Sequence, residues 1–102
     1  MVIVLLSAQG YTVEGASTGQ DALQKYMEKP VDVVILDLIM PDQDGLETMR
    51  ELRKRDPKCK ILVMSGTDQL YLKVARHLGA NQTISKPIDP DELVAKVREL
   101  VA

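Results

Sequence analysis

The chain has 102 residues, which suits one domain and is too short for two. Hydrophobic residues make up 45% and aromatic residues 3%, so a core must be built from Val, Ile, Leu, Met and Ala. The net charge of -2 gives no reason to expect binding to nucleic acid or to a membrane through a basic surface. A single cysteine, Cys59, excludes a disulfide within the chain. No apolar run approaches the roughly 20 residues that span a bilayer, so we expect a cytoplasmic protein.

The first residues are apolar and allow two local structures. Met1–Leu6 is too short for a secretory signal and lacks its basic start. A helix of this length is marginal, and Val2–Val4 is β-prone, so we expect a strand. This strand either turns at residues 7–10 into the next strand or pairs with a second chain by domain swapping.

The next segments predict a strand followed by a helix. Tyr11–Ala16 has the composition of a short strand. Ser17 or Thr18 can cap a helix that runs to Lys29, where Pro30 ends it.

The rest of the chain continues this alternation, which is typical of a parallel sheet covered by helices. Strands are expected at Val31–Leu36, Ile61–Met64 and Gln82–Ser85, and helices at Leu46–Arg55, at Gln69–Leu78 and from Asp89-Pro90 onward. Asp56-Pro57 ends the first of these helices, and Gly79 stands at the C′ position of the second.

Polar residues follow three of the expected strands. Asp37 comes directly after the apolar run Val31–Leu36, Ser65 follows the next strand, and Lys86 follows the last. The carboxyl ends of parallel strands meet at one edge of a sheet, where ligand sites of open α/β sheets lie. An acid held there is a candidate phospho-acceptor or metal ligand.

The order and spacing of these residues resemble the receiver domain of two-component response regulators. The matching pieces are Asp37, Met40-Pro41, Asp44-Gly45, Met64-Ser65-Gly66, Gly79-Ala80 and Lys86-Pro87. The resemblance implies one domain over residues 1–102 with a flavodoxin-like three-layer α/β fold, in which helices cover both faces of a mainly parallel sheet.

The resemblance also implies roles for single residues. Asp37 would accept a phosphoryl group from a histidine kinase or phosphotransfer protein, and Ser65 and Lys86 would contact that group. Mg²⁺ would be bound by Asp37 and the backbone carbonyl of Ile39. The Lys86-Pro87 bond would be cis.

The chain departs from the family at its beginning. Relatives start with a central strand that ends in an acidic pair, followed by a full first helix, and we expect that strand, the pair and most of the helix to be missing here. Mg²⁺ binding would then be weak or absent, Lys86 would pair directly with Asp37, and phosphorylation would be impaired. Loss of the middle strand would leave unpaired edges at Thr12 and Val33, which favours a homodimer or higher oligomer.

Three functions are compatible with these features. The first is a stand-alone phospho-acceptor module of a phosphorelay. The second is a phosphorylation-independent, dimerising interaction module, and the third is a truncation product of a longer receiver. We do not expect an enzyme, because a phosphatase with Asp37 as nucleophile usually has a second acid two residues later, where Ile39 stands. Relatives often carry an aromatic residue three positions before the lysine, where Thr83 stands, so an aromatic switch is not expected.

Overall fold

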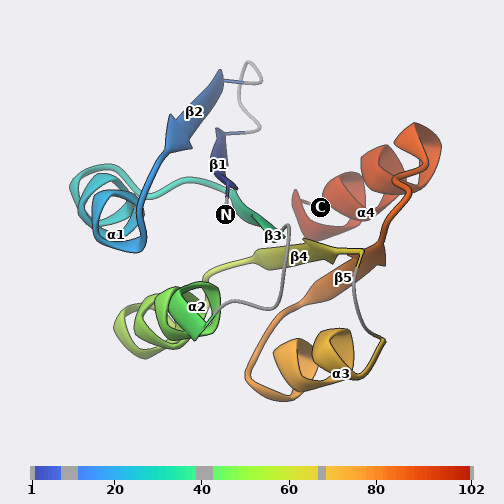
Figure 1. Cartoon of the computed structure of the whole chain (residues 1–102). Helices are drawn as coiled ribbons and strands as arrows, with labels where there is room; N and C mark the ends of the chain where they lie inside the picture. Colours follow the sequence, from blue (N-terminus) through green and yellow to red (C-terminus); the bar gives the residue numbers. More distant parts are fainter. Residues whose placement is uncertain (1, 8–11, 39–42, 67–68, 102) are drawn as a thin grey trace.

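The computed structural model describes residues 2–7, 12–38, 43–66 and 69–101. The elements in these ranges are β1 (Val2–Ser7), β2 (Thr12–Ala16), α1 (Gly19–Glu28), β3 (Val33–Leu38), α2 (Gln43–Arg55), β4 (Ile61–Ser65), α3 (Gln69–His77), β5 (Gln82–Ser85) and α4 (Pro90–Val101). The strands form one sheet in the order β2-β1-β3-β4-β5 (Figure 1). Within the described ranges, no helix combines the length and the apolar character that crossing a membrane requires.

β1 occupies the middle of the sheet and runs against its neighbours. It pairs antiparallel with both β2 and β3, so that Ile3 lies opposite Ala16 on one side and Leu36 on the other. The strand expected from the β-prone N-terminal residues is therefore confirmed. The prediction of unpaired edges on β2 and β3 was wrong, because β1 of the same chain pairs with both strands.

Helices cover both faces of the sheet (Figure 1), which confirms the flavodoxin-like three-layer arrangement. Ile3 and Leu5 of β1 belong to the larger core, which also contains residues of α1, α2 and α3. Val4 and Leu6 point to the opposite face and pack with the smaller core under α4. This alternation follows from the period of two along a strand, and it needs apolar residues at every position of β1 that enters a core.

Helix ends are set by the residues that the sequence singles out. The Thr18 hydroxyl accepts a hydrogen bond from the Asp21 N–H at 3.0 Å, and Asp89 accepts one from the Asp91 N–H at 3.0 Å. Gly79 has φ +119°, as expected for a residue that ends a helix in the left-handed region. The Lys86-Pro87 bond is cis.

The two ends of β3 and the beginning of α2 differ from the predicted ones. β3 begins at Val33 instead of Val31, and Val31 packs against the larger core outside the strand. β3 ends at Leu38 instead of Leu36, so Asp37 is the second-last residue of the strand and not the residue after it. α2 begins at Gln43 instead of Leu46.

Arg53 connects α2 to the strands that carry the candidate site. Its guanidinium donates to the carbonyl oxygens of Cys59 and Gly79, each at 2.6 Å, and to Asn81 Oδ1 at 2.9 Å. Asn81 Oδ1 also accepts from the N–H of Ile61 at 2.9 Å. These bonds hold the segments before β4 and β5 together.

A tyrosine–aspartate hydrogen bond joins α1 to the end of α2. The buried Tyr26 hydroxyl donates to Asp56 Oδ2 at 2.5 Å, and the Lys58 N–H donates to Oδ1 at 2.9 Å. The Tyr26 bond, followed by the Lys58 bond, holds the pKa of Asp56 below its ordinary value. Burial, followed by the bond to Asp56, raises the pKa of Tyr26.

The variant Tyr26→Phe tests this bond through the pH dependence of stability. A carboxyl whose pKa is depressed in the folded state stabilises the protein above its unfolded pKa of about 3.9, and this contribution is lost as the pH falls through the folded value. We therefore expect the loss of unfolding free energy in Tyr26→Phe to be larger at neutral pH than at acidic pH. Urea unfolding at both pH values measures it, and NMR titration should show the pKa of Asp56 moving up.

The control is the same substitution in an Asp56→Asn background. There the effect of Tyr26→Phe should not change over the acidic range. A pH-dependent effect that persists without the Asp56 carboxylate would contradict the assignment.

Candidate functional site

The site lies at the edge of the sheet where β3, β4 and β5 end. β3 places Asp37 there, with Met64 of β4 opposite it on one side and Val2 of β1 opposite it on the other. The Asp37 side chain is 30% exposed, so its carboxylate is accessible at the edge of an otherwise apolar strand. A central strand that is covered on both faces is a rigid support for such a group.

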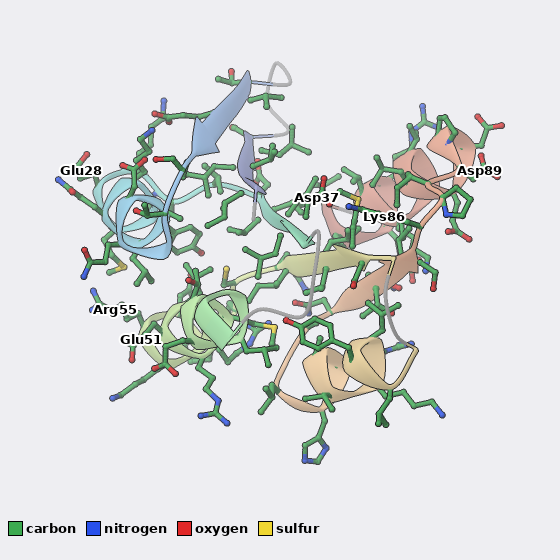
Figure 2. All side chains as sticks on the ribbon, viewed as in Figure 1. Glu28, Asp37, Glu51, Arg55, Lys86 and Asp89 are labelled. Atoms are coloured by element: carbon green, nitrogen blue, oxygen red, sulfur yellow. The ribbon has the colours of Figure 1, made fainter. Side chains whose placement is uncertain are left out.

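Lys86 reaches Asp37 from the end of β5. The Lys86 Nζ lies 2.6 Å from Asp37 Oδ1, and Figure 2 shows the two side chains meeting at this edge of the sheet. The Lys86 backbone N–H donates to the Ser65 carbonyl at 3.1 Å. The stem of the lysine lies over Gly66, where a side chain would bring its Cβ to only 3.0 Å from Lys86 Cβ. The backbone bond and the glycine together fix the direction in which the lysine extends.

Ser65 is the last residue of β4, the strand between those of Asp37 and Lys86. It lies in register with Leu38 of β3 and Ser85 of β5, and it is 1% exposed. The structure therefore brings Asp37 and Lys86 into contact and places Ser65 on the strand between them. Ile39, whose backbone carbonyl was expected to bind a metal, lies outside the described residues.

In the described site, the negative charge of the Asp37 carboxylate faces the positive charge of the Lys86 ammonium. Asp37 Oδ1 is enclosed by protein and accepts no hydrogen bond from the described residues, so its contact with the ammonium is an ion pair without hydrogen-bond geometry. A carboxylate oxygen is a competent nucleophile toward phosphorus, and an adjacent ammonium can neutralise the charge that transfer brings. The arrangement suits an anionic group on Asp37.

The described residues do not fit a dedicated Mg²⁺ site. They contain no group of three or more Asp, Glu, His or Cys residues that is arranged to hold a metal ion. β1 has no acid, and its first residue, Val2, lies opposite Asp37. Mg²⁺ requires near-octahedral oxygen coordination and gives up water reluctantly. One carboxylate that already faces an ammonium does not meet that requirement.

Gly66 and Arg53 support the site in ways that the sequence only partly signals. Gly66 belongs to the Met64-Ser65-Gly66 motif, but its role under the Lys86 stem depends on the approach of two strand ends. Arg53 lies far from the site in sequence and holds together the strands that carry Ser65 and Lys86. A network of one arginine with backbone carbonyls has no local sequence pattern.

Comparison with known proteins agrees with this geometry. The family model for the response regulator receiver domain matches residues 1–98. The chemotaxis protein CheY of Thermotoga maritima is 34% identical over 98 residues, which cover 94% of this chain and 82% of the relative. The transcriptional regulatory protein TrcR of Mycobacterium tuberculosis is 35% identical over 99% of this chain, which spans only 40% of that protein.

A solved structure has the same fold. The CheY-like response regulator receiver domain protein of Methanospirillum hungatei JF-1 superposes with a TM-score of 0.77 at 30% identity, covering 91% of this chain and 75% of the other. The family match spans nearly all of the chain, and the relatives include a chemotaxis protein and a transcriptional regulatory protein. The chain therefore belongs to the response regulator receiver domain family, whose members are phosphorelay signalling modules.

Proposed function

We propose that Asp37 accepts a phosphoryl group from a phosphohistidine of a histidine kinase or phosphotransfer protein. The single observation that carries this proposal is the 2.6 Å contact between Lys86 Nζ and the Asp37 carboxylate at the carboxyl edge of the sheet. Ser65, on the strand between them, is the proposed hydroxyl contact of the phosphoryl group. The relatives' receiver function supports the assignment of these roles.

The proposed transfer balances as a displacement at phosphorus. A carboxylate oxygen of Asp37 forms the new O–P bond as the P–N bond of the donor breaks, and the electron pair of that bond goes to the imidazole nitrogen. The phosphoryl group then carries about −1.5 to −2 charge on its oxygens. The Lys86 ammonium can move its contact from the carboxylate to these oxygens.

We further propose that this transfer is slower than in relatives with a full acidic site. The nucleophile is held in an ion pair before transfer, and that pair must separate as phosphorus approaches. The described strands β1, β4 and β5 contain no acidic residue that could draw the ammonium away from Asp37 or hold a metal beside it. Impaired phosphorylation follows from both features.

Small phosphodonors test the acceptor. Incubation with acetyl phosphate should add one phosphoryl group slowly, as seen by intact mass, and peptide mapping should place it on Asp37. Asp37→Asn should abolish uptake. The matched control is Asp32→Asn, which removes an exposed carboxylate just before the same strand and should leave uptake unchanged. Equal uptake in native protein and Asp37→Asn would rule out Asp37 as the acceptor.

Self-association stays a prediction, and exposed valines now support it in place of the unpaired strand edges. β1 pairs the inner edges that were expected to be open, but the smaller core, which α4 covers, contains no described residue of β2. Val13 of β2 is opposite Leu6, hence on this face, and is 61% exposed. Val94 and Val101 of α4 are 48% and 37% exposed.

The two α4 valines lie on the flank of the helix away from its contact with β5. Lys96 of α4 donates to the Thr83 carbonyl of β5 at 2.6 Å, which fixes the other flank toward β5. At 100° per residue, Val94 and Val101 are on the flank away from Lys96. These valines and Val13 are exposed apolar residues on the α4 side of the sheet and are called here the valine face; their exposure favours the second candidate function, a dimerising interaction module.

Light scattering tests the oligomer. At micromolar concentration we expect the mass of a dimer or a larger assembly, and the double variant Val13→Glu/Val101→Glu should shift it to a monomer, because charges are costly to bury in an interface. Leu70→Glu is the control, since Leu70 is 64% exposed on α3, which packs on the other face. A monomer mass for the native chain would exclude the oligomer.

A further inference from the structure

The direction of β1 determines which residue of the central strand lies beside Asp37. An antiparallel strand brings its beginning to the edge where its parallel neighbours end. Val2 is therefore opposite Asp37, and the strand ends at the far side of the sheet with Ser7. The end of β1 beside Asp37 is therefore its apolar start, and Ser7, the polar residue of the strand, lies at the opposite end.

The Lys86 ammonium already supplies a positive charge beside the Asp37 carboxylate. It contacts the Asp37 oxygen that is enclosed by protein, and its position is set by the Ser65 carbonyl and by Gly66 under the stem. A divalent ion would have to displace this ammonium and lose part of its hydration shell in return for one carboxylate. Mg²⁺ gives up its water reluctantly, so the exchange is unfavourable.

We infer that the Asp37 site works without Mg²⁺ and that Lys86 is its resident counter-charge. This inference departs from the Mg²⁺ dependence that the family implies. Its statement about phosphorylation rests on the proposed function, whereas its statement about Mg²⁺ binding does not. The carboxylate and the ammonium form a neutral pair before transfer, and afterwards the ammonium offsets about one unit of the phosphoryl group's charge of about −1.5 to −2. Mg²⁺ should then change neither the occupancy of the site nor the extent of phosphorylation.

The first test is a Mg²⁺ titration of the unmodified protein followed by amide NMR. Signals of Leu36, Asp37, Ser65, Gly66 and Lys86 should show no saturable shift at millimolar MgCl₂ compared with NaCl of equal ionic strength. Asp42, Asp44 and Asp68 have side chains outside the described part of the chain, and the same titration reports on them. A saturable shift at the site would overturn the inference.

The second test restores a metal site in the observed register. Directly opposite residues of an antiparallel pair have Cβ atoms about 4.5–5.5 Å apart, so Val2→Asp adds a carboxylate beside Asp37. Val2→Asn is the matched control, with nearly the same shape and no charge. We expect Mg²⁺ affinity to rise about tenfold or more in Val2→Asp relative to Val2→Asn. Circular dichroism checks that both variants are folded, and equal affinities in the two folded variants would refute the register argument.

The third test separates this inference from the proposed function. Acetyl phosphate is supplied with either MgCl₂ or EDTA, and the mass gain is compared. Equal uptake under both conditions supports the inference, and uptake that requires Mg²⁺ overturns it. Absence of uptake under both conditions would contradict the proposed function, while the Mg²⁺ titration of the unmodified protein would still decide the metal question.

Discussion

The antiparallel pairing of β1 between β2 and β3 is the constraint on which both the fold and the site depend. An inner strand has hydrogen-bonding groups on two edges, and buried groups of this kind are costly when unpaired. β1 satisfies β2 on one side and β3 on the other, and its alternating side chains enter both cores. The same pairing places an apolar residue, Val2, beside Asp37. The pairing that closes the sheet is therefore also the pairing that leaves Asp37 without an acidic neighbour on β1.

The balance of charge at the edge follows from how the other strands are held. Arg53 ties the segment before β4 to the segment before β5 at one end of the sheet. At the other end, the Lys86 N–H binds the Ser65 carbonyl, and the lysine stem crosses Gly66. The ammonium thus has few positions to adopt, and the Asp37 carboxylate lies within its reach. The position of Lys86 is a property of the fold and not of the side chain alone.

Much of this arrangement was predictable from the sequence, since strand ends, caps and motif spacing are local. Thr18 and Asp89 mark helix beginnings through side-chain oxygens that accept backbone N–H groups, and Gly79 marks a helix end through its left-handed backbone. Asp37, Ser65 and Lys86 follow three strands, which is enough to predict that they share an edge. The antiparallel direction of β1 follows from a short turn into β2, because parallel neighbours need a long crossover connection. The sequence left open whether this strand pairs within the chain or with a second chain. The role of Arg53 depends on partners 26 and 28 residues away, at Gly79 and Asn81, which no local pattern reveals.

Under the proposed function, a phosphoryl group on Asp37 would change the charge that Lys86 faces at this edge of the sheet. β5 carries Thr83 three residues before Lys86, and its carbonyl is bound by Lys96 of α4 at 2.6 Å. This bond anchors α4 to the backbone of β5, the strand that leads to Lys86. Moving the Lys86 ammonium from a carboxylate to a phosphoryl group changes the negative charge that it faces from about −1 to about −1.5 to −2. Under the proposed function, the Asp37–Lys86 ion pair is the contact that phosphorylation would change.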